Sequence, residues 1–215
     1  MNAIPSYLFP ALATLAAYLI GSLSFAVIVS RCMGLNDPRT YGSGNPGATN
    51  VLRSGSKVAA AATLLLDAAK GWLPVVLVRC YGAAYGLEDG SVALVGLAAF
   101  LGHLYPVFFR FQGGKGVATA IGVLMGISAV LGLATLATWL VIAAFFRYSS
   151  MASLVAALFA PFYYLIGDRV AWYAEKPVTA AILAMSGFLI WRHRQNLRRL
   201  IEGQEPKLGQ KRPRG

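Results

Sequence analysis

Two glycine-rich segments carry residues suited to binding an anion. The first reads Gly42-Ser43-Gly44-Asn45-Pro46-Gly47-Ala48-Thr49-Asn50 and is followed closely by Arg53. Backbone N–H groups in such tight turns can converge on anionic oxygens, and an arginine adds a matching positive charge. An ordinary Gly/Asn loop between two helices would use the same residue types, so composition alone leaves both interpretations open.

The second segment, Gly113-Gly114-Lys115-Gly116, stands directly before an apolar stretch. It offers backbone amides, a lysine and the N-terminus of the following helix to a phosphate. The spacing is not that of a P-loop, which requires Gly-x4-Gly-Lys-Ser/Thr, so the segment alone is a weak signal. As a second anion-binding loop on the same face of the molecule it is a stronger one.

Three ionisable residues lie inside apolar stretches. Asp67 and Lys70 are three residues apart, so on a helix they share one face and can neutralise each other. His103 lies about seven residues from the end of its stretch, and a histidine in such a place favours a functional role. Charges are costly in lipid, so all three side chains should face the interior of a helix bundle. For Asp67 and Lys70 a structural ion pair and a substrate contact stay equally good interpretations.

The segment 192–205 ends the apolar part of the chain. If the last helix continues through it, one face carries His193, Asn196, Leu197 and Leu200. Its arginines 192, 194 and 198 fit better a polybasic segment that binds anionic lipid headgroups. Ser150 and Ser153 begin another apolar stretch, where helix capping is favoured over a hydrogen bond to a substrate.

The elements that position these segments must lie largely in lipid. The chain has 215 residues, of which 57% are hydrophobic and 13% charged, whereas soluble proteins carry about 25% charged residues. The net charge of +11 comes from basic residues between long apolar runs, which indicates orientation in a membrane and excludes nucleic acid as the partner. The first 30 residues lack a basic n-region, so no cleaved signal peptide is expected. Cys32 and Cys80 fall at opposite ends of successive spans, which predicts neither a disulfide nor a metal site.

The apolar pattern predicts an all-α integral membrane protein, a bundle of seven transmembrane helices in one polytopic domain covering residues 1–215. The expected spans are 5–30, 58–78, 90–109, 116–128, 131–146, 148–167 and 177–191. The stretch 116–146 would be about 46 Å long as a single helix, too long for the bilayer core, so a break near Gly126–Gly132 is expected. Seven spans place 15 of the 19 basic residues on one side, including the C-terminal tail with Lys211, Arg212 and Arg214. The N-terminus is therefore expected outside and the C-terminus in the cytoplasm, with a re-entrant loop for one short helix as an alternative.

The spacing of the aspartates and histidines argues against several classes of reaction. A magnesium-dependent alcohol phosphotransferase would need clustered aspartates, and the His-x4-Asp dyad of many acyltransferases needs an aspartate five residues after a histidine. Phe108 and Arg198 stand at those positions instead. The aspartates are scattered: Asp37, Asp67, Asp89 and Asp168. Neither cysteine has a histidine partner in these segments, which tells against a thiol nucleophile. Direct transfer on a positively charged surface remains, with an organophosphate transporter as the alternative and a non-catalytic lipid-binding scaffold third.

Taken together and in order, these segments resemble the bacterial acyl-phosphate:glycerol-3-phosphate acyltransferases of the PlsY type. The likeness covers almost the whole chain and includes Asp67-x-x-Lys70-Gly71. It implies an enzyme of the bacterial inner membrane, with its active site on the cytoplasmic side. The enzyme would transfer a fatty acyl group from acyl phosphate to the sn-1 hydroxyl of glycerol 3-phosphate, in phospholipid synthesis. The products would be lysophosphatidic acid and inorganic phosphate, with no cofactor, no metal, membrane lipid as surroundings and a monomer as the working unit.

The resemblance also assigns roles to residues. The predicted catalytic residues are Ser43, Arg53, His103, Lys115, His193 and Asn196. Ser43, Arg53 and Lys115 would bind glycerol 3-phosphate, with the amides of the two glycine loops binding the acyl phosphate. The predicted substrate-binding residues are Gly44, Asn45, Gly47, Thr49, Asn50, Asp67, Lys70, Gly113, Gly114, Gly116, Ser150, Ser153, Arg199 and Glu205. The general base stays open between His103, His193 and a phosphate of the substrate itself.

Overall fold

A computed structural model describes residue 5 and residues 8–210 of the chain. The predicted residues Lys211, Arg212 and Arg214 of the basic tail, and part of the start of the first expected span, lie outside this range. The described residues fold into ten α-helices, which confirms the all-α class. These are α1 (Phe9–Gly21), α2 (Phe25–Cys32), α3 (Ala48–Val51), α4 (Lys57–Tyr81), α5 (Asp89–Leu104), α6 (Val117–Ile127), α7 (Ala129–Phe146), α8 (Ser149–Ile166), α9 (Lys176–Arg192) and α10 (Arg194–Ile201).

Four helical segments are long and apolar enough to cross a membrane. They are Lys57–Tyr85, Asp89–Phe109, Ala129–Phe146 and Ser149–Ile166, and the bent pair α1 and α2 makes a fifth if it crosses as one span. In the described chain α6 and α9 are shorter, at 11 and 17 residues. The helices occupy the segments in which spans are expected, while the number of crossings and the orientation stay predictions.

The first expected span, 5–30, is two helices rather than one, because the chain breaks between Gly21 and Phe25 and bends by 45°. Gly21 lies directly against α5, where a methyl group on it would lie 2.1 Å from the carbonyl oxygen of Ala99. The break leaves the carbonyl of Leu23 without its helical partner, and the ammonium group of Lys70 donates to it over 2.6 Å. A buried cation on a neighbouring helix therefore satisfies the broken helix.

The long apolar stretch 116–146 breaks at Ser128, within the interval that the sequence predicts. Ser128 is extended, with φ −153° and ψ 129°, and separates α6 from α7. The guanidinium of Arg79 donates to the carbonyls of Gly126 and Ile127 at the end of α6. Arg79 thus supplies the hydrogen bonds and the positive charge that a helix C-terminus favours.

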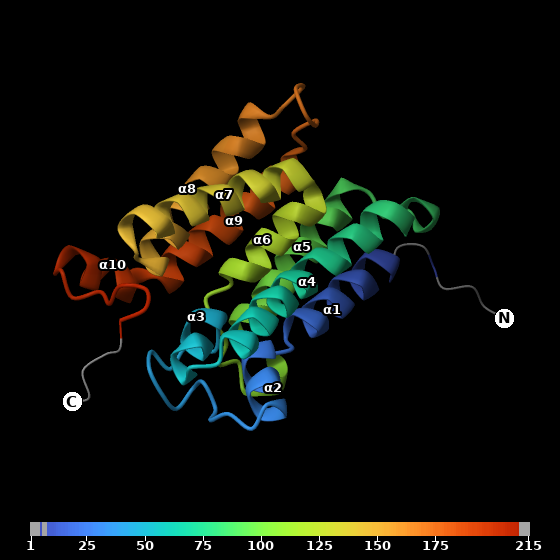
Figure 1. Cartoon of the computed structure of the whole chain (residues 1–215). Helices are drawn as coiled ribbons and strands as arrows, with labels where there is room; N and C mark the ends of the chain where they lie inside the picture. Colours follow the sequence, from blue (N-terminus) through green and yellow to red (C-terminus); the bar gives the residue numbers. More distant parts are fainter. Residues whose placement is uncertain (1–4, 6–7, 211–215) are drawn as a thin grey trace.

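Small residues allow the helix backbones to pack closely against one another. A methyl group on Gly122 of α6 would lie 1.9 Å from the carbonyl oxygen of Ala68 in α4, and one on Gly102 of α5 would lie 2.4 Å from that of Tyr18 in α1. Such backbone-to-backbone packing is characteristic of helices in membranes. At one end of the bundle lie α2, α3 and α10, opposite the start of α1 and the α8–α9 connection (Figure 1). All of the predicted loop and C-terminal motifs gather at this α10 end.

Candidate active site

A cavity of about 300 Å³ opens at the α10 end of the bundle. Three segments that are far apart in the sequence surround it: the first glycine loop, the second glycine loop and the junction of α9 with α10. Its lining residues are Ser43, Gly44, Asn45, Gly113, Lys115, Arg192, Arg194, Gln195, Asn196 and Arg199. Four of these carry a positive charge and none is acidic, so the cavity is suited to an anion with more than one charge.

The first glycine loop is organised by Asn50, whose side chain is buried beneath it. Its amide nitrogen donates to the carbonyls of Pro38, at 2.6 Å, and Tyr41, at 3.2 Å. Its oxygen accepts from the backbone N–H of Ser43 at 3.0 Å and from the guanidinium of Arg53 at 3.1 Å. Asn50 therefore shapes the loop and orients Ser43 and Arg53 from below, and it does not line the cavity.

The backbone conformation of the first loop requires glycine at two positions. Gly42 and Gly44 have φ of +61° and +66°, in the left-handed region that favours glycine. A methyl group on Gly42 would in addition lie 2.3 Å from the side-chain oxygen of Asn50. The loop reaches α8 through Thr49, whose hydroxyl lies 3.3 Å from that of Ser149.

Several loop amides already have hydrogen-bond partners in the chain. The amide of Gly44 donates to Tyr41, that of Gly47 to Asn45 and that of Gly114 to His103. The positive potential of the cavity therefore comes mainly from its side chains. Anion binding by the amides of the two loops stays a prediction.

The second glycine loop is held between two helices. Gly113 and Gly114 lie against the end of α5, where methyl groups on them would come within 2.1 Å of the carbonyl oxygen of His103 and 2.3 Å of its Nε2. From the α9 side, Nη2 of Arg192 donates to the carbonyls of Gly113, at 2.9 Å, and Gly114, at 3.0 Å. The guanidinium also lies 5.8 Å from the ring centroid of Tyr105.

The position of Arg192 differs from the one that the sequence predicted, in a segment that binds lipid headgroups. Headgroup binding does not describe Arg192, because it lines the cavity and holds the second loop. Arg198 fits the earlier interpretation better, because it is exposed and pairs with Glu202 at 2.8 Å. The signal that could have found Arg192 is its place four and seven residues before Asn196 and Arg199, the spacing of one face in a continuous helix, although the structure ends α9 at Arg192 and begins α10 at Arg194.

Lys115 is the first residue in a series of hydrogen bonds at the cavity. Its ammonium group donates to the side-chain oxygen of Asn196, whose amide donates to Glu205 at 2.7 Å. Ser150 and Arg199 also donate to the carboxylate of Glu205, each at 2.7 Å. Burial tends to raise the pKa of Glu205, but these three hydrogen bonds outweigh it and hold the pKa below its usual range. Burial lowers the pKa of Lys115 to about 8, with the nearby arginines adding to the effect against the opposing charge of Glu205.

The two histidines predicted to be catalytic do not line the cavity. His193 is buried at the α9–α10 junction, where Nδ1 lies 2.8 Å from the carbonyl of Leu189. Burial lowers the pKa of His193 to about 4, and the charge of Lys115 adds to this shift. The ring is therefore neutral near pH 7, Nδ1 donates to Leu189, and Nε2 is left as a weakly basic acceptor. His103 lies behind the second loop, in the interior of the bundle.

The sequence-predicted residues thus separate into three groups. Those that line the cavity are Ser43, Gly44, Asn45, Gly113, Lys115, Asn196 and Arg199. Those that contact the lining, directly or through one residue, are Gly47, Asn50, Arg53, Gly114, Ser150 and Glu205, while Thr49, Gly116 and His193 bond or pack against residues outside the lining. Asp67, Lys70 and His103 lie in the bundle interior, and Ser153 faces a different pocket. Gln195 lines the cavity although the sequence did not single it out, and Arg194, like Arg192, lines it although the sequence favoured headgroup binding for both.

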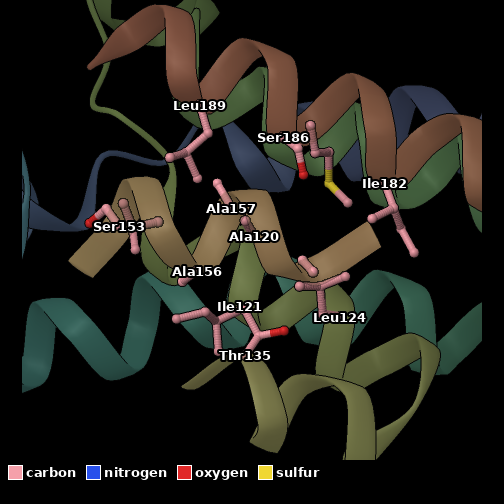
Figure 2. Close-up of a pocket in the computed structure, with 13 residues that line it drawn as sticks. Ala120, Ile121, Leu124, Thr135, Ser153, Ala156, Ala157, Ile182, Ser186 and Leu189 are labelled. Carbon is pink, nitrogen blue, oxygen red and sulfur yellow. The ribbon is translucent and has the colours of Figure 1, made fainter. Parts of the chain in front are cut away.

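A second, apolar pocket lies between α6, α7, α8 and α9 (Figure 2). It measures about 20 Å³ and is almost wholly apolar. Its lining residues are Val117, Ala120, Ile121, Leu124, Thr135, Ser153, Ala156, Ala157, Ala160, Ile182, Met185, Ser186 and Leu189. One end of this pocket is close to the cavity along the chain, because Val117 lies two residues after Lys115 and Leu189 lies three residues before Arg192.

Comparisons with known proteins identify a family that matches most of the chain. Residues 11–203 match the model of a family described as glycerol-3-phosphate acyltransferase. A protein of that description from Albidiferax ferrireducens is 71% identical over 94% of this chain and 91% of its own length. One from Ralstonia nicotianae is 64% identical over 91% of this chain and 92% of its own length.

Solved structures are similar over the same extent. The crystal structure of PlsY, described as an integral membrane glycerol 3-phosphate acyltransferase, superposes in its glycerol 3-phosphate form with a TM-score of 0.85 at 36% identity. That match covers 93% of this chain and 96% of the other. The lysophosphatidic acid form superposes with a TM-score of 0.83 at 34% identity, over 93% and 95% of the two chains.

Proposed function

The chain belongs to the glycerol-3-phosphate acyltransferase family, and we propose that it acylates the sn-1 hydroxyl of glycerol 3-phosphate with a fatty acyl phosphate as donor. The products are lysophosphatidic acid and inorganic phosphate. Relatives with solved structures, in forms named for glycerol 3-phosphate and lysophosphatidic acid, support the acceptor and the product. The acyl-phosphate donor and the sn-1 position rest on the sequence resemblance.

One observation carries this proposal: the cavity brings four cationic side chains together beside an apolar pocket. The reaction needs two phosphate-bearing substrates held close together, one of which carries a long hydrocarbon chain. We assign glycerol 3-phosphate to Ser43, Arg53 and Lys115, with Asn196 and His193 nearby. The acyl phosphate occupies the side formed by the two glycine loops and the α9–α10 junction.

The chemistry asks for positioning more than for a reactive side chain. An acyl phosphate is a mixed anhydride, so the acceptor hydroxyl attacks its carbonyl carbon directly, the bond from that carbon to the phosphate oxygen breaks, and phosphate leaves. Holding both reactants in a productive geometry can supply roughly 7–11 kcal/mol. No covalent enzyme intermediate and no metal is needed for this step.

The proton of the acceptor hydroxyl passes to a phosphate of the substrate in this proposal. Two observations support that choice over a histidine. His103 is separated from the cavity by the second glycine loop, and His193 has a pKa of about 4, which makes it a weak base. His193 is buried between the lining residues Arg192 and Arg194 and would hold this part of the cavity wall in place.

The acyl chain extends into the apolar pocket between α6, α7, α8 and α9 (Figure 2). Its start at Val117 and Ser153 is the end close to the anion cavity along the chain, and its far end is formed by Leu124 and Ala160. Each far residue lies two helical turns beyond the near one, about 10 Å along the axis. The pocket must widen to admit a chain, and the small side chains along α8 leave room for that movement.

The protein is membrane-bound, and we further propose seven crossings with the cavity on the cytoplasmic side of a bacterial inner membrane. The basic residues around the α10 end support this orientation. The working unit is proposed to be a monomer, since one chain supplies all the residues of the cavity. An organophosphate transporter would need its anion site near the middle of the membrane, whereas this cavity lies at one end of the bundle.

The direct test is phosphate release from palmitoyl phosphate by the purified protein, without added metal. Release that depends on glycerol 3-phosphate and yields lysophosphatidic acid, with palmitoyl-CoA inert in parallel reactions, is the expected result. Turnover only with palmitoyl-CoA would contradict the donor. Uptake of unchanged glycerol 3-phosphate into proteoliposomes, with no acylation, would support a transporter instead.

A further inference from the structure

Asp67, Lys70 and His103 form a buried cluster in the bundle interior that the chemistry above does not use. We propose that this cluster positions the loop Gly113–Gly116, and through it Lys115, so that His103 acts on the reaction without touching a substrate. The inference deepens the proposed function and rests on it.

The side chains of the cluster come from α4, α5 and α6 and contact one another. The carboxylate oxygen Oδ1 of Asp67 lies 2.7 Å from Nζ of Lys70 and 3.6 Å from Nδ1 of His103. The hydroxyl of Thr119 donates to the backbone carbonyl of Asp67 at 2.9 Å and lies 3.2 Å from the same Nδ1. All of these side chains are buried.

These contacts fix the orientation of the His103 ring. Thr119 has a single hydroxyl proton, which it donates in a hydrogen bond to the carbonyl of Asp67. The hydroxyl oxygen of Thr119 can therefore only accept a hydrogen bond from Nδ1 of His103. Nδ1 therefore carries the proton and faces Thr119 and the carboxylate of Asp67. The other ring nitrogen, Nε2, faces the second glycine loop.

The loop lies directly on this ring. The amide of Gly114 donates to the carbonyl of His103 at 3.1 Å, and a methyl group on Gly114 would lie 2.3 Å from Nε2 and 2.9 Å from the carbonyl oxygen of Pro46. His103 thus lies beneath the place where the two glycine loops meet. Arg192 holds the same two loop residues from the opposite side. Lys115 is the next residue, so its position depends on both supports.

Lys70 ties the cluster to the first helical pair as well. Its ammonium group donates to the carbonyl of Leu23 at the α1–α2 break and lies 5.6 Å from the ring centroid of Phe25. An apolar pair of the same volume is often as stable as a buried ion pair. Stability alone therefore does not account for three ionisable groups here, whereas a fixed orientation of His103 does.

The first experiment is a double-mutant cycle between His103 and Lys115. We expect His103→Ala to lower kcat/KM for glycerol 3-phosphate by about tenfold or more, the range for a residue that supports a functional group. The double variant His103→Ala/Lys115→Gln should be no slower than Lys115→Gln alone, because His103 acts through Lys115. Effects that multiply would show an independent role for His103 and overturn the inference. Inactive wild-type protein would contradict the proposed function instead, and the two failures are therefore distinguishable.

Hydrogen exchange gives a readout that needs no turnover. In His103→Ala the amides of residues 113–116 should exchange faster, while those of α7 and α8 exchange as in the wild type. Ser30→Ala is the matched control, a buried hydroxyl of α2 with no hydrogen-bond partner among the described residues. It should change neither the exchange of the loop nor kcat/KM. Unchanged exchange at residues 113–116 in His103→Ala would overturn the inference.

A third pair of variants separates positioning from a purely structural ion pair. Asp67→Asn leaves Lys70 charged and unpaired in the interior, so both the Tm and kcat/KM should fall. Asp67→Asn/Lys70→Met removes both charges, and we expect the Tm to recover in part, because the carbonyl of Leu23 loses its donor, while kcat/KM stays low. Recovery of both would show that the cluster is only an ion pair and would contradict the positioning role.

Discussion

The two glycine-rich loops are built in opposite ways. The first is shaped from within its own segment, because Asn50 bonds to Pro38, Tyr41, Ser43 and Arg53, all within 12 residues of it. The second is held by His103, 11 residues before Gly114, and by Arg192 of α9, 79 residues after Gly113. The first loop is thus organised by one side chain of its own segment, whereas the second also needs α9 in place.

The largest expected effect comes from filling the second loop. Gly113→Ala places a methyl group 2.1 Å from the carbonyl oxygen of His103, a backbone atom that cannot move aside. A displacement of Lys115 by about 1 Å could then cost about 100-fold in kcat/KM. Gly47→Ala in the first loop meets only the side chain of Asn45 at 3.1 Å and should cost much less. Equal losses in steady-state assays of the two variants would remove the distinction between the loops.

The next largest effect is expected from the organiser of the first loop. Asn50→Ala leaves the carbonyl of Pro38 buried without its donor, at about 1–3 kcal/mol, and removes the acceptor of the part-buried amide of Ser43. The Tm and kcat/KM should both fall. Asn50→Asp, which keeps the acceptor for Ser43 and Arg53 but loses the two donors, should retain more activity. An Asn50→Ala variant with wild-type kinetics would show that the loop does not depend on this side chain.

Loosening the second loop from the α9 side should have a smaller effect. Arg192→Lys ends one bond short of Nη2, the single nitrogen that donates to the carbonyls of both Gly113 and Gly114, so we expect about a tenfold loss in kcat/KM. Arg198→Lys is the matched control, since that side chain is exposed and pairs only with Glu202 among the described residues. It should leave the kinetics unchanged. Similar losses in both variants would show that the activity does not depend on the bonds from Arg192 to Gly113 and Gly114.

The smallest effect expected is a pH dependence that belongs to the second loop alone. The pKa of Lys115 is lowered to about 8, so the lysine is charged below pH 8 and loses its charge as the pH rises through that value. The KM for glycerol 3-phosphate should therefore rise between about pH 7 and 9, while the substrate stays a dianion. Lys115→Arg should flatten this rise, because an arginine remains charged. A rise that persists in Lys115→Arg would assign the titration to another group.

Local pattern was enough to predict much of this molecule. Apolar runs gave the positions of α4, α5, α7 and α8, and glycine and asparagine marked the first loop. The proline- and charge-free stretch 116–146 was rightly expected to break, although Arg79, which caps the break, was not identified. The roles of residues whose partners are close in sequence were therefore the easiest to predict.

The rest depended on contacts between distant segments. The α1–α2 break is stabilised by Lys70, 47 residues away, and the second loop by Arg192, 79 residues from Gly113. His103 looked catalytic because a histidine in an apolar span is unusual, yet only the packing of α5 against the loop reveals that the ring faces a backbone. Such long-range contacts leave no periodic trace in the sequence.

A crystal structure with glycerol 3-phosphate would test the central claim most directly, that the two loops and the α9–α10 junction form one substrate site. The account predicts the phosphate group in the 300 Å³ cavity, within hydrogen-bond distance of Ser43 and Lys115. A phosphate bound elsewhere, with the cavity unchanged and Lys115 still bonded to Asn196, would contradict it.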